Sequence, residues 1–210
     1  MKGAGRQLAI VGAALAVGLG LWVGSYVWRF GGLAPGVANL LIDHPRLATL
    51  AASGLHITSS ELPSDVVPLA LGDQRADLAL TDLDGRTRHL SEWDGQRVVL
   101  NFWATWCHPC REEMPLFDAL QNELGPQGVQ VLGIGLDGPD KIRAWITAHP
   151  QSFPILLGQP LGYDVSKQFG NRISAVPYSV LIGPDGRLLR RHLGSFDSAG
   201  ELRDWVLGGG

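Results

Sequence analysis

The feature that most constrains the fold is the stretch RVVLNFWATWCHPCREEMP, which joins a buried strand to a helix through two cysteines. Residues 97–103 form a near-continuous apolar run, typical of a strand buried on both faces of a sheet. A helical pattern follows from Cys107 to Leu124, with apolar side chains on one side and polar ones on the other. The sequence therefore places a CxxC pair on the first turn of a helix that follows a core strand.

The segments that follow alternate between strand and helix patterns. Residues 129–136 indicate a second buried strand and residues 140–149 a second helix, which together predict a parallel strand pair with a crossover helix. A hairpin is expected next, with strands at 178–182 and 188–193 around the turn GPDG. Ser198 is placed to cap a closing helix. We predict an α/β fold whose mixed parallel and antiparallel sheet is flanked by helices.

The N-terminal residues have the composition of a membrane segment. An uncharged run extends from Leu8 to Val27, after Lys2 and Arg6. A spanning helix needs roughly 20 apolar residues, whereas the apolar part of a cleaved signal peptide has about 7 to 15. We therefore predict a retained transmembrane anchor in residues 1–30 with its N-terminus in the cytoplasm. A signal peptide cleaved near GGLAPGVA is the alternative.

The rest of the chain divides into a connector and one domain. Proline and glycine punctuate residues 31–68, which we interpret as a connector. Regular patterns begin near Leu69, with a hairpin around Asp84-Gly85, so residues 69–210 are expected to form a single domain. The net charge of −3 lacks the basic excess that nucleic acid binding requires, so nucleic acid is excluded as a partner.

The position of the cysteines at a helix start favours redox chemistry. The free amide groups and the positive end of the helix dipole stabilise a thiolate at Cys107. Such positions lower the thiol pKa from roughly 8.5 to about 3.5–7.5, which supplies a nucleophile at neutral pH. Cys110 lies one turn further along and is placed to attack the mixed disulfide that Cys107 forms.

Three other interpretations of the pair are weaker but open. A structural disulfide across two residues would restrict the unfolded chain little. Two inert buried thiols do not fit the Trp, His and Pro residues around the motif. A zinc or copper site would need further ligands, and the histidines show no metal-ligand spacing. These are His44, His56, His89, His108, His149 and His192.

The motif and its surroundings resemble the thioredoxin superfamily, and in particular the membrane-anchored ResA and TlpA thiol-disulfide oxidoreductases. The likeness includes LTDLDGRTRHLSEWDGQRVVLNFWATWC and AVPYSVLIGPDGRLLRRHLG and covers about two-thirds of the chain. It implies a thioredoxin-like fold in which Cys107 is an exposed nucleophile and Cys110 a buried resolving thiol. It also implies a cis bond between Val176 and Pro177, beside the cysteines, where an extended substrate would pair with the backbone.

Further residues are expected to tune the thiols or to contact the substrate. Asn101 stands where thioredoxin itself has a buried aspartate, and Glu113 matches a glutamate near the cysteines of the ResA-like group. Glu113 lies three residues beyond Cys110 on the same helix face, where a buried carboxylate can exchange protons with the thiols. A protonated His108 would stabilise the Cys107 thiolate. Trp106 is expected to shield the site and to contact partner proteins.

The function implied is that of an extracytoplasmic disulfide reductase at the inner (cytoplasmic) membrane, with its domain in the periplasm or outside the cell. A chain with no third cysteine suits an oxidising compartment. The resemblance implies a membrane-embedded thiol reductant as electron donor. It implies disulfide-containing protein substrates such as apocytochrome c, the copper sites of a terminal oxidase or a more general set.

Cofactor and activity expectations follow from the same motif. No cofactor or metal is expected beyond the redox-active disulfide between Cys107 and Cys110. A copper-binding or copper-delivery module that uses both thiolates is the main alternative, although the only methionines are Met1 and Met114. A peroxidase of related fold is a third possibility, which the placement of WCxxC disfavours.

Overall fold

The computed structural model describes residues 67–158 and 164–208. The anchor expected in residues 1–30 lies outside the described residues, and so does the connector up to residue 66. Within the two described ranges, no helix is both long and apolar enough to cross a bilayer.

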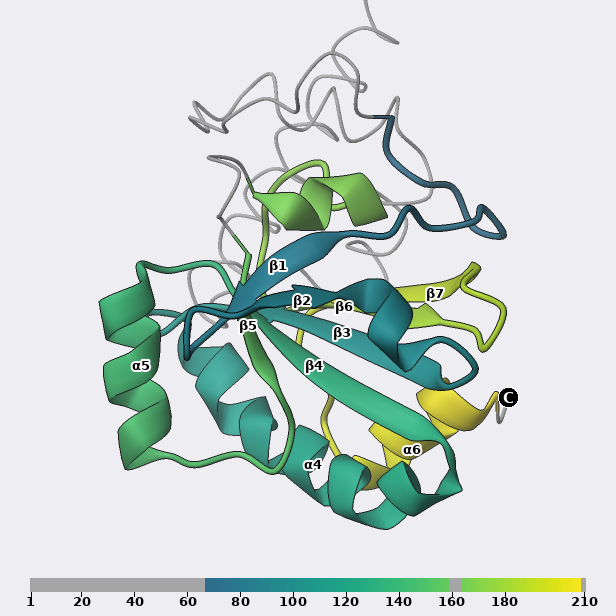
Figure 1. Cartoon of the computed structure of the whole chain (residues 1–210). Helices are drawn as coiled ribbons and strands as arrows, with labels where there is room; N and C mark the ends of the chain where they lie inside the picture. The colour runs from purple at the N-terminus through teal and green to yellow at the C-terminus, as the bar shows by residue number, and fades with distance from the viewer. Residues whose placement is uncertain (1–66, 159–163, 209–210) are drawn as a thin grey trace, which may run out of the picture. The chain divides into compact units, whose positions relative to one another are not determined.

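Seven strands of the described residues form one mixed sheet (Figure 1). They are β1 (Ala79–Asp82), β2 (Thr87–His89), β3 (Arg97–Trp103), β4 (Val129–Gly135), β5 (Ile155–Leu157), β6 (Tyr178–Ile182) and β7 (Leu188–Leu193). Their order is β2-β1-β5-β4-β3-β6-β7. β3 and β4 are parallel, while β1 and β2, like β6 and β7, pair antiparallel. The predicted mixed sheet, parallel pair and both hairpins are confirmed.

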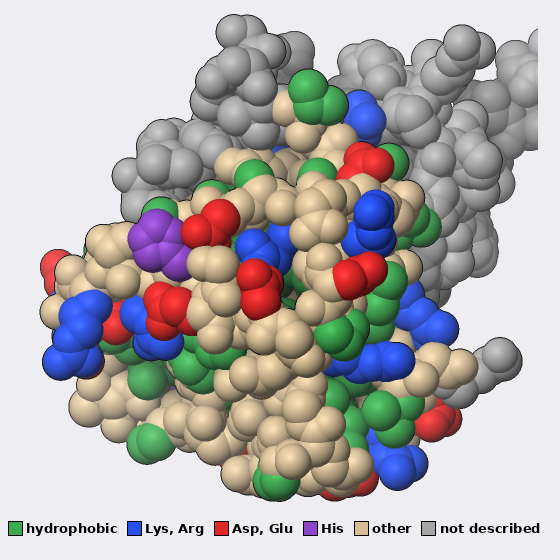
Figure 2. Space-filling model, turned by 45° about the vertical axis from the view of Figure 1, so that its right-hand side comes forward, with side chains coloured by type: hydrophobic (Ala, Val, Ile, Leu, Met, Phe, Trp, Pro, Cys, Tyr) green, Lys and Arg blue, Asp and Glu red, His purple; other side chains and the backbone are tan. Residues whose placement is uncertain are grey.

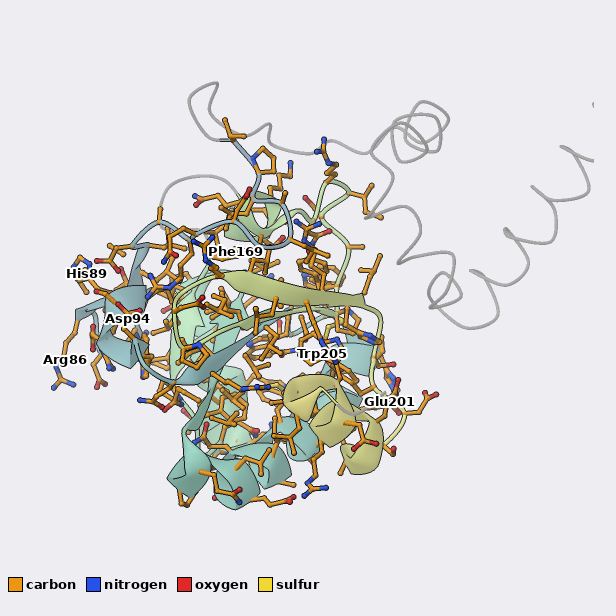
Figure 3. The ribbon with its side chains drawn as sticks, turned by 90° about the vertical axis from the view of Figure 1, so that its right-hand side faces the viewer. Arg86, His89, Asp94, Phe169, Glu201 and Trp205 are labelled. Carbon is orange, nitrogen blue, oxygen red and sulfur yellow. A yellow bond between two sulfur atoms is a disulfide. The ribbon has the colours of Figure 1, made fainter. Side chains whose placement is uncertain are left out.

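Helices lie on both faces of this sheet. They are α4 (His108–Leu124), α5 (Pro139–Ala148) and α6 (Ala199–Leu207), with the 3-10 helices η1 (Leu90–Trp93), η2 (Gly125–Gln127) and η3 (Val165–Phe169). In Figure 1, α4, α5 and α6 lie on one side of the sheet and η3 lies on the other. Figure 3 shows the same division, with Phe169 of η3 and Trp205 of α6 on opposite sides of the strands. The helix that begins at the cysteines is therefore packed against the sheet rather than exposed all round.

Strand β3 fixes the position of α4 because its two faces are both buried. Its side chains alternate across the sheet. Val99 and Trp103 belong to the buried core that includes Met114 of α4. Phe102 faces the other way, with its ring centroid 5.8 Å from that of Phe169. The chain leaves β3 for α4 directly, so this packing places the cysteines at the end of the central strand.

Helix α6 closes the same face through a capped N-terminus. The Ser198 hydroxyl accepts a hydrogen bond from the Glu201 backbone N–H at 3.2 Å, as an N-cap residue does. Leu202 and Val206 are buried against the core. The closing helix and its cap are confirmed.

Acidic and basic side chains are interleaved on the face shown in Figure 2. Around the first hairpin, for example, Arg88 pairs with Glu92 at 2.7 Å and His89 pairs with Asp77 at 3.2 Å. Such exposed pairs contribute little to the stability of the fold, because solvent screens their charges. This face therefore offers a mixed charge rather than a field of one sign.

Candidate active site

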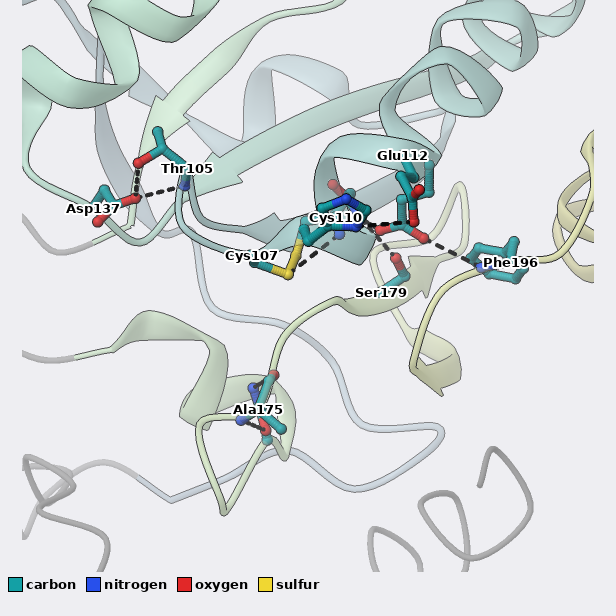
Figure 4. The surroundings of a disulfide bond; sticks show 12 residues. Thr105, Cys107, Cys110, Glu112, Asp137, Ala175, Ser179 and Phe196 are labelled. Carbon is teal, nitrogen blue, oxygen red and sulfur yellow. Dashed lines mark hydrogen bonds and ion pairs between the residues drawn. A yellow bond between two sulfur atoms is a disulfide. The ribbon is translucent and has the colours of Figure 1, made fainter. Parts of the chain in front are cut away.

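The cysteine pair forms a disulfide at the N-terminus of α4 (Figure 4). The two sulfur atoms are 2.04 Å apart and the Cα atoms 5.3 Å apart. Cys107 is the N-cap residue, and its sulfur accepts a hydrogen bond from the Cys110 backbone N–H at 3.2 Å. A thiolate released at Cys107 would therefore already face a backbone donor and the positive end of the helix.

The expectation of an exposed Cys107 is wrong for this oxidised form. Cys107 is only 4% exposed and Cys110 is fully buried at 0%. The Cys107 sulfur is bonded to Cys110 and accepts a hydrogen bond from the Cys110 backbone N–H. The order of exposure still agrees with the expected roles, since Cys107 is the more accessible of the two.

Glu113 lies in the core near the disulfide, three residues after Cys110 on α4. It is 2% exposed. Its Oε1 accepts a hydrogen bond from Asn101 Nδ2 at 2.9 Å, and its Oε2 accepts one from the Phe196 backbone N–H at 3.3 Å. Burial raises the pKa of this carboxyl to about 8, against the opposing effect of the two hydrogen bonds. The group is therefore mostly protonated at neutral pH and can gain or release a proton in the working range.

Asn101 connects this carboxyl to the neighbouring strand. Its Nδ2 also donates to the Ser179 hydroxyl at 3.2 Å, from β3 to the paired position on β6. Its Oδ1 is buried and has no hydrogen-bond partner among the described residues. The strand position that the resemblance associates with an acid thus holds a neutral amide that orients Glu113.

Trp106 and His108 lie on the outside of the site. The Trp106 side chain is one of the few large apolar groups at the surface, 68% exposed. His108 Nδ1 is 3.2 Å from Glu112 Oε2, and both side chains are largely exposed. His108 therefore faces Glu112 at the surface.

The loop before β6 faces the disulfide (Figure 4). The Val176–Pro177 peptide bond is cis. Val176 packs against the buried cluster that contains both cysteines, and Figure 4 shows Ala175 in the loop that faces the disulfide. The Pro177 carbonyl accepts a hydrogen bond from the Gly194 N–H at 2.9 Å, which ties the loop to the end of β7. Residues far apart in sequence thus converge on one site.

Sequence reasoning missed the contact between Thr105 and Asp137. The Thr105 backbone N–H and hydroxyl donate to Asp137 Oδ2 at 2.6 and 2.7 Å (Figure 4). The sequence contained a signal for this contact. Asp137 follows β4 and Thr105 follows β3, and two neighbouring parallel strands end at the same edge of a sheet. The carboxylate fixes the loop that leads into Cys107.

A metal site would need a cluster of ligand side chains. In residues 67–158 and 164–208, no group of three or more His, Cys, Asp or Glu side chains is placed to hold a metal ion. Both sulfurs of the pair are engaged with one another.

Sequence comparison identifies a protein family that the chain matches. A family model described as AhpC/TSA matches residues 71–191. The thiol-disulfide oxidoreductase ResA of Halalkalibacterium halodurans is 33% identical over 124 residues, which are 59% of this chain and 68% of that protein. ResA of Geobacillus kaustophilus is 35% identical over 145 residues, 68% of this chain and 79% of that protein.

Solved structures share the fold. A structure from Chlorobium tepidum described as thiol:disulfide interchange protein DsbE is 29% identical, with a TM-score of 0.59, and the match covers 66% of this chain and 96% of that one. The exposed lipoprotein thioredoxin Etrx1 of Streptococcus pneumoniae is 28% identical, with a TM-score of 0.55, covering 63% and 99%. The predicted thioredoxin-like fold is confirmed.

Proposed function

Since the chain belongs to the AhpC/TSA family and, within it, to the ResA-like thiol-disulfide oxidoreductases, we propose that it reduces disulfides of partner proteins outside the cytoplasm. The observation that carries this proposal is the Cys107–Cys110 disulfide at a helix N-terminus beside the buried carboxyl of Glu113. The N-terminal part of α4 would thus supply the nucleophile Cys107, the resolving thiol Cys110 and the proton acceptor Glu113.

The reaction begins with the reduced pair. The Cys107 thiolate attacks one sulfur of the substrate disulfide, and the other substrate sulfur leaves as a thiolate. The ionised fraction of Glu113 takes the proton of the Cys110 thiol, and the resulting thiolate attacks the Cys107 sulfur. The second substrate sulfur leaves, and the Cys107–Cys110 disulfide forms. Two electrons have passed to the substrate, and the proton rests on Glu113, which suits the raised pKa of that carboxyl in the oxidised form.

The substrate would be held by the residues around the disulfide. Trp106 presents an exposed apolar ring, and Val176 and Pro177 form the facing loop. We assign these three residues to substrate binding and His108 to the tuning of Cys107. Oxidised CxxC pairs of apocytochrome c or of oxidase copper sites are the candidate substrates, as is a more general set of proteins.

Return to the reduced state needs an external donor of two electrons. A membrane-embedded thiol reductant of the inner membrane fits this role, with residues 1–30 as a single-pass anchor, 31–68 as connector and 69–210 as the extracytoplasmic domain. We expect the full chain to remain in the membrane fraction after an alkaline wash. Recovery in the soluble fraction would contradict the anchor.

Covalent trapping tests the proposed function. In the Cys110→Ser variant Cys107 can still attack, but the mixed disulfide has no resolving thiol and accumulates. We expect protein adducts that a reducing agent releases, and none with the Cys107→Ser, Cys110→Ser double variant. A folded and exported Cys110→Ser protein that traps no partner would contradict the proposal.

The copper-binding alternative uses the same two thiolates and is tested separately. Reduced protein is titrated with Cu(I) in competition with a chelator. Tight binding that the double variant loses, together with failure to transfer electrons to any disulfide, would favour the copper function over the reductase. Peroxide consumption by the reduced protein would favour the third alternative.

A further inference from the structure

His192 is a titratable residue buried in the same layer of the core as Glu113. It lies in β7 and is 7% exposed. The strand register pairs Asn101 of β3 with Ser179 of β6, and Ser179 with His192. Directly paired residues place their side chains on the same face of a sheet. Three polar side chains therefore form one row on the face where Asn101 binds Glu113.

The His192 ring packs flat against Phe196, in the turn after β7. The two ring centroids are 4.0 Å apart and the planes are 16° from parallel. The Phe196 ring also meets Phe117 of α4 at 5.9 Å and Trp205 of α6 at 5.3 Å. Aromatic pairs in such arrangements contribute beyond the area they bury. The rings around Phe196 therefore fix its side chain, and with it the backbone at this point of the turn.

His192 and Glu113 bind opposite ends of one peptide group. His192 Nε2 is 3.4 Å from the Ser195 carbonyl oxygen. The Phe196 N–H of the same trans peptide donates to Glu113 Oε2 at 3.3 Å (Figure 4). A carbonyl oxygen only accepts, so Nε2 carries the hydrogen in this contact. Because the C=O and N–H of a trans peptide point in opposite directions, the imidazole and the carboxyl lie on opposite sides of this group.

This chain of hydrogen bonds affects the charge state of the carboxyl. Hydrogen bonds in a chain polarise one another and strengthen each bond by about 10–30%. Donation to the Ser195 carbonyl makes the Phe196 N–H a better donor, and a carboxylate accepts such a bond more strongly than a neutral acid does. Both hydrogen bonds are long, so we expect an effect smaller than that of one full hydrogen bond.

His192 acts on Glu113 without carrying a positive charge. Burial lowers the pKa of the His192 imidazole from its ordinary value of 6.5. The hydrogen bond with the Ser195 carbonyl and the acidic side chains of Asp197 and Glu201 oppose this change but do not reverse it. The imidazole is therefore neutral near pH 8, where Glu113 titrates. A substitution of His192 changes the position of a donor in that range, and not a charge.

We propose that His192 is a positioning residue that holds the Phe196 N–H against the Glu113 carboxylate. The carboxylate can then accept the proton of the Cys110 thiol at a lower pH than it could without this support. The inference rests on the proposed function, in which Glu113 is the proton acceptor of the resolving step. Its first test, however, measures the carboxyl itself and needs no substrate.

That test titrates Glu113 in the oxidised full chain by ¹³C NMR of its side-chain carboxyl, with the signal assigned from its loss in Glu113→Gln. His192→Phe keeps a ring over Phe196 and removes the Nε2 donor. We expect the midpoint of the Glu113 titration to rise by about 0.5 pH unit, which is part of the energy of one hydrogen bond. His192→Gln restores a side-chain N–H donor and should bring the midpoint back toward that of the wild type.

His149 offers a matched control at the exposed end of α5. Its ring stacks on Trp145 with the centroids 4.5 Å apart, and its Nδ1 is 3.0 Å from the Trp145 carbonyl oxygen. His149→Phe should leave the Glu113 midpoint unchanged. An unchanged midpoint in His192→Phe, or an equal rise in His149→Phe, would overturn the inference.

The wild-type protein gives a test that does not depend on the folding of a variant. ¹⁵N NMR at pH 8 should show a neutral His192 with its hydrogen on Nε2. The Phe196 amide signal should titrate with the same midpoint as the Glu113 carboxyl. A hydrogen on Nδ1 instead, or a Phe196 amide that does not follow the carboxyl, would contradict the inference.

A kinetic test follows the proton into the reaction. Prereduced protein is mixed with a linear synthetic peptide that has an internal CxxC disulfide, and the mixed disulfide and its resolution are followed by acid quench. A midpoint higher by about 0.5 leaves about threefold less ionised Glu113 at pH 7, so resolution in His192→Phe should slow about threefold. Attack by Cys107, measured in the Cys110→Ser background, should stay within about twofold.

The outcomes separate the inference from the proposed function. Equal slowing of attack and resolution in His192→Phe would overturn the positioning role. Wild-type protein that reduces no peptide, while its Glu113 titration responds to His192→Phe as expected, would instead overturn the proposed function.

Discussion

Glu113 combines a titratable group with an apolar setting. The carboxyl lies among buried side chains of α4 and the sheet, and it has two hydrogen-bond donors, Asn101 Nδ2 and the Phe196 N–H. Two neutral donors offset only part of the cost of burying a charge. The carboxyl therefore holds its proton to about pH 8 in the disulfide form, well above its usual value of 4.5.

This raised pKa makes stability depend on pH in a defined direction. Between about pH 4.5 and about pH 8 the folded protein keeps a proton that the unfolded chain releases. The stabilisation that this proton provides is fully present below the pKa that Glu113 has in the unfolded chain. It is lost as the pH rises through the pKa of Glu113 in the folded protein. Relative to Glu113→Gln, the free energy of unfolding of the oxidised wild type should fall by up to about 1.4 kcal/mol per pH unit in this window. Urea unfolding of both proteins across the window measures the difference, and parallel pH profiles would refute the assignment.

The substitution Asn101→Asp, which places a second carboxyl beside Glu113, should destabilise the fold. In Asn101→Asp a second carboxyl would face Glu113 where Nδ2 now donates at 2.9 Å, and two buried carboxylates at that separation cannot both ionise. We expect a loss of about 2–4 kcal/mol in unfolding free energy at high pH, and a smaller loss at low pH, where both groups are protonated. Asn122→Asp, on the exposed face of α4, is the control and should cost about 0.5 kcal/mol at most. An equal loss at both pH values would show that charge is not the cause.

The sequence predicted these residues to different degrees. Cys107, Cys110 and Glu113 share a helix, so their spacing alone places them together. The Phe196 N–H could not be predicted, because a backbone donor 83 residues away has no side-chain signature. The burial of Cys107 was also not predicted, because the spacing of the two cysteines does not indicate how exposed they are.

The loop between β3 and α4 is held by the carboxylate of Asp137, which lies in the loop between β4 and α5. Asp137→Ala would leave both the N–H and the hydroxyl of Thr105 without their acceptor. We expect a loss of about 1–3 kcal/mol in unfolding free energy. Asp140→Ala is the matched control, because its fully exposed side chain makes only a 3.4 Å pair with Arg143 and should matter by about 0.5 kcal/mol or less. Similar losses in chemical denaturation for both variants would contradict a structural role for Asp137.

Elements with strong local signals were predicted nearly to the residue. Strand β3 has a continuous apolar run, and α6 has its Ser198 cap and a regular apolar stripe. The second helix was expected at 140–149 and begins at Pro139 instead, because proline suits the first position of a helix. The pairing of β1 with β5 had no such signal, since it joins strands from distant parts of the chain.

At the scale of the whole molecule, the sheet brings four separate segments to one point. Asn101 comes from β3, Glu113 from α4, Ser179 from β6 and Phe196 from the turn after β7. The order of the strands follows from the resemblance to thioredoxin rather than from periodicity, which describes each element but not its neighbours. Asp137 was missed although its signal was available, because the parallel pairing of β3 and β4 places the ends of these two strands at one edge.

We predict that the same arrangement gives the two sulfurs unequal roles in the reaction. Prereduced Cys110→Ser and Cys107→Ser proteins, mixed with the CxxC disulfide peptide, acid-quenched and analysed by intact mass spectrometry, test it most directly. We predict that Cys110→Ser gains the mass of one peptide, bound through Cys107, and that Cys107→Ser remains unmodified over the same time. A peptide adduct on Cys110 in Cys107→Ser, formed as fast as the adduct on Cys107, would contradict the assignment of nucleophile and resolving thiol.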